Sequence, residues 1–328
     1  MILPLLALAF TSLAADSSSL HGTSADSLLL RFGGDLLLAG HYEAAMGDGP
    51  VHALDGFTAL AGADIAMVNL ECPITVRGVR VPKPYNFRMP PRYTRLLSGA
   101  GIDIVSLANN HIFDYGKEGL FDTISYLDSA GVRHVGAGRN QEEAYRPVVC
   151  RIRGHAVAYL AYYGGGESPG AGKNRPGVAR RDLGLVTAAL KAVRTDSCAT
   201  YVVVNLHWGT EKAERPDPAQ RAFARALIDA GADAVIGHHP HVLQGIERYR
   251  AGVIVYSLGN FVFGGNNRST YDTGLFEVRL GAGAPAYAFI PVRVDAWRVS
   301  LLSGPDSASV VERVRRLSAG FTRNIFTN

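Results

Sequence analysis

Residues 230–241 read AGADAVIGHHPH, and the same pattern opens two earlier stretches, AGADIAMVNLE (61–71) and AGIDIVSLANNH (100–111). Each stretch runs Ala-Gly-x-Asp, then an apolar run, then polar residues. A glycine at this point is typical of the end of a helix or turn, and we expect the aspartate to begin a strand. The pattern therefore predicts three similar strands along the chain.

Outside these stretches, short apolar runs alternate with amphipathic ones, which is typical of an α/β protein with a parallel or mixed sheet. Further strands are predicted at residues 27–35, 155–163, 199–209, 253–261, 276–280 and 286–295. Helices are predicted at residues 92–100, 117–130, 182–194, 217–230 and 309–321. The 328 residues are 47% hydrophobic and can bury a sizeable core, which fits one large domain or two modest ones, and we expect one.

Charge and cysteine content exclude some classes of function. The net charge of +4 is spread along the chain with no basic run, so we expect no nucleic-acid partner. Three cysteines, Cys72, Cys150 and Cys198, are too few and too scattered for a disulfide framework or a cysteine zinc site.

The chain opens with MILPLLALAFTSLAAD, an apolar run followed by small residues. Its length is that of a signal-peptide core and is too short to span a bilayer. We expect residues 1–15 to be a signal peptide, with export to the periplasm or cell surface. The alternative is a misplaced start, because positive charges are missing from this segment. Membrane association is expected only through partners or through an uncleaved N-terminus.

Polar side chains follow the apolar runs at five places. They are Asp35, Glu71, Asn110 with His111, His207, and His239 with His241. In α/β sheets, ligands bind beyond the carboxyl ends of the strands. Alone, each residue has an ordinary alternative as a turn former, a solvated charge or a half-buried histidine. Their joint placement predicts one shared site.

The chemistry of this set points to metal ions. Carboxylate, amide and imidazole ligands suit divalent Zn, Mn or Fe, and a carboxylate can bridge two ions about 3.5–4 Å apart for phosphoryl chemistry. In GHHPHVLQGIE (237–247), an extended backbone would point His239 and His241 to the same side. His238 would point away, which favours a partner of the ligands or a substrate contact.

Six motifs in order carry a resemblance to a known family. They are FGGDLLLAG, NLECPIT, SLANNHIFDYG, NLHWGTE, GHHPHVLQGIE and YSLGNFVF. Together they resemble the CapA/PgsA family of bacterial capsule and poly-γ-glutamate synthesis proteins, in the calcineurin-like metallophosphoesterase superfamily. The resemblance implies a β-sandwich of mixed sheets flanked by helices over residues 28–293, with residues 294–328 as a C-terminal extension that packs on the same domain.

The resemblance also implies roles for single residues. The metal ligands, for one or two divalent ions, would be Asp35, Glu71, Asn110, His207, His239 and His241, with Glu71 in the bridging position. His111 would protonate the leaving group, and Asp114 would orient it. The superfamily's first motif is Asp-x-His, but Leu37 stands in the place of its histidine, and His41 lies too far along to replace it. One metal site is therefore predicted to lack a ligand.

Candidate substrate contacts are His238, Glu211 and Arg88, each with solvent exposure or a structural role as the alternative. Arg88 lies with Lys83 in a proline-rich loop that could cover the site or serve only as a connector. The glycine-rich stretch 164–177 is expected to be a loop, and it lacks the Lys-Ser/Thr of a phosphate-binding P-loop. Asn260 is expected to fix a turn after a buried strand.

Two functions are compatible with the resemblance. The first is a metal-dependent hydrolase that acts on a phosphoester or on an anionic polymer such as poly-γ-glutamate. The second is a non-catalytic subunit that binds polymer in a capsule synthesis or export complex. A third interpretation, an intracellular nucleotidase, requires that the N-terminus is not a signal peptide.

Overall fold

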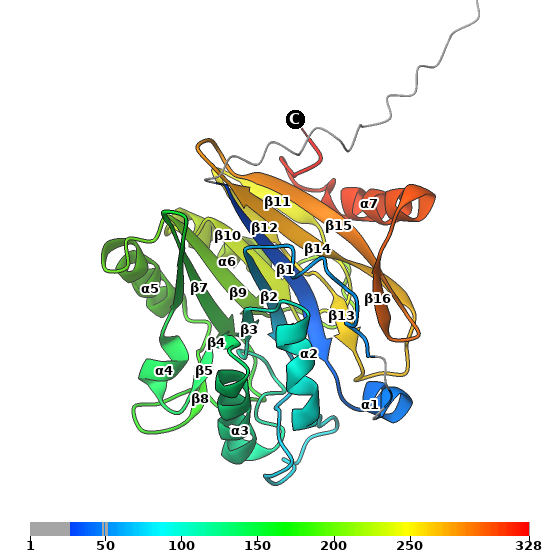
Figure 1. Cartoon of the computed structure of the whole chain (residues 1–328). Coiled ribbons are helices and arrows are strands. Elements are labelled where there is room, and N and C mark those ends of the chain that lie inside the picture. The colour runs from blue at the N-terminus through cyan, green and yellow to red at the C-terminus, as the bar shows by residue number, and fades with distance from the viewer. Residues whose placement is uncertain (1–26, 48, 50–51, 328) are drawn as a thin grey trace, which may run out of the picture.

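The computed structural model describes residues 27–47, 49 and 52–327 (Figure 1). The expected signal peptide at residues 1–15 lies outside the described residues. Among the residues that are described, no helix combines the length and the apolar character that a membrane span requires.

Two mixed sheets face each other across the core (Figure 1). The first has the order β16-β15-β14-β1-β2-β3-β4, and β13 also pairs with β1. Its strands are β1 (Leu28–Leu37), β2 (Ile65–Leu70), β3 (Ile104–Ser106), β4 (Arg133–Val135), β13 (Asn260–Phe263), β14 (Tyr271–Leu280), β15 (Ala286–Asp295) and β16 (Arg298–Leu301). The central strands β1 to β4 are parallel, so their carboxyl ends meet at one edge.

The second sheet has the order β11-β12-β10-β9-β7-β6. Its strands are β6 (Val148–Ile152), β7 (His155–Tyr163), β9 (Tyr201–His207), β10 (Ala234–His238), β11 (Ile246–Tyr249) and β12 (Gly252–Val255). Its centre, β7, β9, β10 and β12, is again parallel. A separate pair is formed by β5 (Ala137–Gly138) and β8 (Gly177–Val178). The expected mixed α/β architecture is confirmed.

Helices cover the sheets on their outer sides, and their residues supply part of the core. They are α1 (His41–Met46), the 3-10 turn η2 (Pro91–Tyr93), α2 (Thr94–Gly99), α3 (Gly116–Ser129), α4 (Gln141–Tyr145), α5 (Leu183–Thr195), α6 (Pro218–Asp229) and α7 (Gly304–Ser318). Helices α1 and α4 are only one to two turns long, which is too short for a periodic signal in the sequence. Helix α7 packs against β15 and β11.

The apolar run of β9 is explained by cores on both sides of the second sheet. Val203 packs in the core between the two sheets, whereas Val202 and Val204 pack in the core under α5 and α6. Because successive side chains of a strand point to opposite faces, a strand that is buried on both faces needs consecutive apolar residues.

The aspartate of each Ala-Gly-x-Asp stretch holds the neighbouring parallel strand. Its carboxylate accepts a hydrogen bond from the backbone N–H of the second residue of that strand. The pairs are Asp64 with Leu29 at 2.8 Å, Asp103 with Ala66 at 2.8 Å, and Asp233 with Val202 at 2.7 Å. These bonds set where neighbouring strands begin relative to each other. The glycines after α2 and α6 adopt positive φ, 78° at Gly101 and 110° at Gly231, as expected for helix ends.

Asp35 lies inside β1, and the expectation that it ends the strand is wrong. The strand continues to Leu37, with register shifts between Phe32 and Asp35 against β2 and directly after Asp35 against β13. A Cβ at Gly34 would lie 2.0 Å from the Gly259 carbonyl oxygen, so only glycine allows this close approach. Such irregularities redirect a side chain without ending the strand.

Candidate metal centre

The six predicted metal ligands converge where the carboxyl ends of the two sheets meet. Asp35 and Glu71 come from β1 and the end of β2, and Asn110 follows β3 in the first sheet. The other three come from the second sheet, His207 from β9 and His239 with His241 from the segment after β10. Both carboxylates are fully buried, and the amide and imidazole groups are buried or nearly so.

Four of these residues form what we call the Asn110 side: Glu71, Asn110, His207 and His239. His207 Nε2 lies 2.9 Å from Asn110 Oδ1 and 3.7 Å from Glu71 Oε1. Ligand atoms of Glu71, His207 and His239 lie within 4.8 Å of one another. Glu71 Oε1 and His239 Nδ1 are buried without a hydrogen-bond partner in the described part of the chain. Buried polar atoms are normally paired, so this donor set fits a divalent cation.

Three residues form what we call the Asp35 side: Asp35, Glu71 and His241. His241 Nδ1 lies 3.3 Å from Asp35 Oδ2, and its Nε2 lies 3.6 Å from Glu71 Oε1. Ligand atoms of the three lie within 4.8 Å of one another. Asn260 Oδ1 lies 2.8 Å from His241 Nδ1 and accepts its hydrogen bond, which orients the ring. Asn260 thus contacts a predicted ligand directly, a role beyond the turn that the sequence indicated.

An apolar contact stands where the superfamily motif has its first histidine. Leu37 is fully buried and lies in register with Phe263, whose ring packs 4.3 Å from the His241 ring. His41 is exposed at the start of α1. The exposed Glu211 instead offers a carboxylate within 4.8 Å of ligand atoms of His239 and His241.

The two buried carboxylates differ in pKa. Burial and then the neighbouring charge of Asp35 raise the pKa of Glu71 well above its ordinary value of 4.5. Burial also acts to raise the pKa of Asp35, but the nearby imidazoles of His238 and His241, at 3.4 Å and 3.3 Å from its oxygens, outweigh it and hold that pKa well below its usual range. Without a cation, Glu71 therefore binds a proton more readily than Asp35 does.

The imidazoles differ in the same way. Burial, and then the charge of a neighbouring histidine, lower the pKa of both His207 and His239. Burial also acts to lower the pKa of His241, but the nearby Asp35 carboxylate outweighs this effect and raises that pKa above 6.5. Imidazole binds cations in its neutral form. His207 and His239 are therefore ready to bind, whereas His241 must first lose a proton.

Asn69 joins the two sides, and sequence reasoning missed it. Its Nδ2 lies 2.9 Å from Asp35 Oδ1, 3.3 Å from Glu71 Oε2 and 3.3 Å from His207 Nδ1. Asn109 Nδ2 in turn donates to Asn69 Oδ1 at 3.2 Å. Because Asn69 stands two residues before Glu71 in an extended segment, it faces the same side of the sheet. That spacing is the signal that could have identified it.

His111 lies beside the ligands with one ring nitrogen already engaged. Its Nδ1 lies 2.8 Å from Asp114 Oδ2, as the resemblance implied, and the residue is 6% exposed. Lys83 Nζ lies 2.5 Å from Asp114 Oδ1 and donates to the Asn110 carbonyl at 2.7 Å. Burial lowers the pKa of His111, and attraction to Asp114 acts in the opposite direction. The Lys83 ammonium group is therefore bound to groups of the protein itself.

Three further expectations can be placed. His238 is 2% exposed with its Nδ1 3.4 Å from Asp35 Oδ1, so it contacts a predicted ligand, and its contact with substrate stays a prediction. Arg88 is exposed and lies over the Tyr115 ring at 4.7 Å. Glu211 lies at the rim, as described above. Substrate contact by Arg88 or Glu211 stays a prediction.

The sequence predicted an extended backbone for the His-Pro-His segment, but the structure shows a turned one. His239 and His241 adopt positive φ values of 98° and 57°. Residues other than glycine rarely take this conformation, and such strain is found at functional sites. The two rings still lie near each other, with centroids 6.0 Å apart, but the loop achieves this by tight turning.

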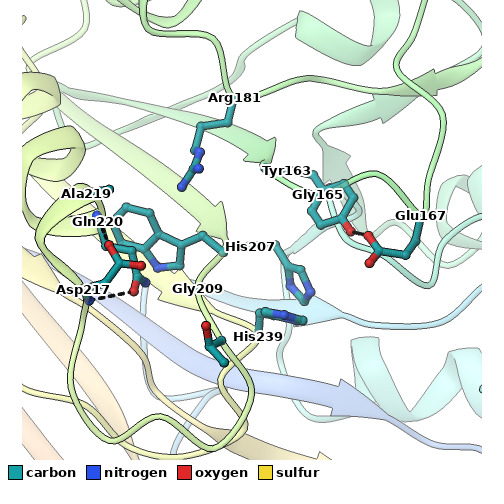
Figure 2. A pocket seen from close by; sticks show the side chains of 13 residues that line it. Tyr163, Gly165, Glu167, Arg181, His207, Gly209, Asp217, Ala219, Gln220 and His239 are labelled. Carbon is teal, nitrogen blue, oxygen red and sulfur yellow. Dashed lines mark hydrogen bonds between the residues drawn. The ribbon is translucent and has the colours of Figure 1, made fainter.

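A cavity of about 280 Å³ adjoins the Asn110 side (Figure 2). His207 and His239 form part of its wall, so the cavity and the Asn110 side share two residues. The glycine-rich stretch 164–177 contributes Gly164, Gly165 and Glu167 to the wall. A small molecule or one unit of a polymer could therefore lie against the predicted ligands.

The sequence is similar to proteins of capsule and polyglutamate synthesis. A family model described as bacterial capsule synthesis protein PGA_cap matches residues 29–265. The capsule biosynthesis protein CapA of Bacillus anthracis is 35% identical over 233 residues, which are 67% of this chain and 56% of that protein. The PGA biosynthesis protein CapA of Bacillus subtilis is 31% identical over 81% of this chain and 71% of that protein. The chain thus spans little more than half the length of the first of these relatives.

Solved structures share the fold at low sequence identity. A putative 5'-nucleotidase from Staphylococcus aureus has a TM-score of 0.51 and 14% identity, covering 88% of this chain and 58% of that one. The NAD nucleotidase of Haemophilus influenzae has a TM-score of 0.50 and 10% identity, covering 90% and 63%. The expected metallophosphoesterase-like fold is confirmed, and the chain belongs to the PGA_cap family of bacterial capsule synthesis proteins.

Proposed function

We propose that this protein is a metal-dependent hydrolase that acts in the synthesis of an anionic capsule polymer, on a phosphoester or on an amide of a polyglutamyl chain. The observation that carries the proposal is the Asn110 side, which gathers a carboxylate, an amide oxygen and two neutral imidazoles around buried atoms that lack partners. The names of the relatives support a role in polymer synthesis.

The residues of the site have distinct tasks in this proposal. Glu71, Asn110, His207 and His239 hold one divalent cation, and the Asp35 side holds a second more weakly. When bound, such cations supply Lewis acidity and lower the pKa of water. His111 protonates the leaving group through Nε2, because Asp114 occupies Nδ1. Lys83 fixes the other oxygen of Asp114 and so keeps this pair in place.

A non-catalytic, polymer-binding subunit of a synthesis or export complex is the second candidate. The observation that favours it is Leu37, which leaves the Asp35 side with three protein ligands. A relative from Mycobacterium tuberculosis, 31% identical over 80% of this chain, carries the name probable polyglutamine synthesis accessory protein. In this case the centre would bind polymer carboxylates through a cation without turnover.

One set of measurements separates the two candidates. Purified protein is analysed for bound metal, and hydrolysis of a generic phosphodiester and of poly-γ-glutamate is then measured with added manganese. A His207→Ala, His241→Ala double variant serves as the metal-site control, and His111→Asn tests the proton donor. If the protein is a hydrolase, both variants should lower the rate of hydrolysis, and His111→Asn should keep its bound metal. Bound metal with a rate no higher than that of the double variant would favour the binding subunit.

We also propose that the protein is exported to the periplasm or cell surface. The support is the apolar run of residues 2–13, followed by small residues. N-terminal sequencing of the protein from cells of the source organism tests this. A mature chain that begins near Ala15 or Asp16 is expected, and an intact Met1 on a protein in the cytosolic fraction would contradict export.

A further inference from the structure

The guanidinium group of Arg181 lines the cavity and has no hydrogen-bond acceptor among the described residues. The residue lies between β8 and α5, and its backbone N–H donates to the Tyr163 carbonyl at 3.0 Å. The guanidinium packs on the rings of Trp208 and Phe223, at 5.8 Å and 5.1 Å from their centroids. Within the described part of the chain it forms neither a hydrogen bond nor an ion pair. A half-buried guanidinium offers five N–H donors and is normally paired.

The preceding residue, Arg180, shows what a structural arginine looks like in the same segment. Its guanidinium donates to the carbonyl oxygens of Gly165 and Ser168, the latter at 2.7 Å, and lies over the Tyr163 ring. Arg180 thus uses its donors to hold the loop after β7. Arg181 has no such task, although burial lowers its pKa and so disfavours leaving the charge unpaired.

The two carboxylates that line the cavity do not pair with Arg181. Asp217 accepts the backbone N–H of Gln220 at 2.7 Å, as the cap of α6, and Glu167 accepts the Tyr163 hydroxyl. Gln220 Nε2 is a second buried donor with no acceptor in the described part of the chain. Figure 2 shows Arg181 reaching into the space between the Tyr163–Glu167 pair and Gln220. The cavity therefore presents uncommitted donors next to His207 and His239.

We propose that Arg181 binds an oxyanion of the substrate, a carboxylate or a phosphate, while the neighbouring reactive group lies at the Asn110 side. The planar guanidinium can pair with either oxyanion through two parallel hydrogen bonds. Because His207 and His239 belong to both the cavity wall and the Asn110 side, one ligand can contact Arg181 and the predicted metal ligands together. This inference rests on the proposed function, which supplies the class of substrate. It adds Arg181 as the residue that selects an acidic substrate.

Tryptophan fluorescence can report on this contact without turnover. The chain has two tryptophans, and Trp297 packs in the core against the Tyr42 ring at 6.0 Å. In a Trp297→Phe background the signal comes from Trp208, on which Arg181 packs. The protein is titrated with tri-γ-glutamate, with its neutral α-amide analogue and with inorganic phosphate. Each titration is run first with a chelator and then with manganese.

Arg181→Gln is expected to weaken binding of the preferred oxyanion by about ten-fold or more, because a hydrogen bond to a charged group usually contributes this much to affinity. Arg181→Lys keeps the charge and should lie in between. Arg151→Gln removes the same charge on edge strand β6 and should change nothing. Preference for tri-γ-glutamate over its α-amide would identify a carboxylate as the ligand, and binding of phosphate alone would identify a phosphate.

Two results would overturn the proposal. One is that neither oxyanion binds, and the other is that affinity in Arg181→Gln equals that in Arg151→Gln, with or without manganese. Binding that depends on Arg181, with no hydrolysis of the bound compound after manganese is added, would contradict the hydrolase and leave the oxyanion site standing. The chelator titration keeps the two outcomes distinguishable.

Discussion

The Asn110 side and the Asp35 side share Glu71, but they hold their protons differently. On the Asn110 side, the pKa values of both imidazoles are lowered, and Glu71 Oε1 and His239 Nδ1 have no hydrogen-bond partner among the residues that the structure describes. On the Asp35 side, the proximity of Asp35 raises the pKa of His241, so a cation there competes with a proton up to a higher pH than on the Asn110 side. One half of the centre is therefore prepared for a cation, and in the other half a proton competes with it.

A list of ligands alone therefore does not tell which of two neighbouring sites binds a cation more tightly. A cation at the Asn110 side satisfies atoms that are otherwise buried without partners. A cation at the Asp35 side must displace the His241 proton and is held by three protein ligands instead of four. We therefore expect the first cation at the Asn110 side and a weaker second one at the Asp35 side.

The largest effect is expected when a ligand is removed from the Asn110 side. His207→Ala should lower the affinity for the first cation by at least about 100-fold, since even the loss of a residue that only orients a metal ligand lowers affinity by about 10–100-fold. His241→Ala should leave the first cation bound and weaken the second. Elemental analysis after dialysis measures both. Equal loss of metal in the two variants would contradict the difference in affinity between the two sides.

A smaller effect on both sides is expected from Asn69→Ala. Asn69 orients Asp35, Glu71 and His207 without being a ligand, so its removal should weaken both cations by about 10–100-fold. Calorimetric titration with manganese gives the two affinities, and the unfolding midpoint of the metal-free variant checks its fold. Weakening confined to one side would show that Asn69 does not join them.

The pH dependence of stability tests the proton on Glu71. The pKa of Glu71 is raised in the folded chain, so the folded state binds more protons than the unfolded state above pH 4.5. Metal-free protein should therefore lose stability relative to Glu71→Gln as pH rises from 4.5 to the folded pKa, by about 1.4 kcal/mol for each pH unit in that window. Denaturant unfolding in chelator at several pH values measures this. A difference that stays constant with pH would contradict the protonated Glu71.

The smallest effect is expected from restoring the missing ligand. Leu37→His should strengthen the second cation several-fold, because the gain of a ligand is offset by the cost of a buried imidazole when no cation is bound. Leu37→Phe provides a ring without a ligand atom and serves as the control. The affinity of the second cation, measured by titration, should rise only in Leu37→His; a rise in both would point to packing.

Much of this centre could be predicted from the sequence because its residues follow recognisable strands. The Ala-Gly-x-Asp stretches located Glu71, Asn110 and His239, and the mixed sheets place them together as expected. The bulge at Asp35 and the positive φ values at His239 and His241 could not be predicted, because both depend on contacts between segments distant in the chain.

The distribution of protons was equally hidden from the sequence. Burial and pairing decide whether His241 or His207 carries a charge, and neither is encoded in a local pattern. Asn69 was missed for a different reason, since an asparagine within an apolar strand gives no metal signal unless the face of the strand is considered. Arg181 gave no signal at all, because only the fold shows that its guanidinium has no acceptor among the described residues.

The most direct test locates the first cation. Crystals are grown with one molar equivalent of manganese, and anomalous scattering is measured at the manganese edge. We predict a single strong peak bounded by Glu71, Asn110, His207 and His239, with a second peak near Asp35 and His241 only at higher concentration. A first peak at the Asp35 side, or two equal peaks at one equivalent, would contradict the account.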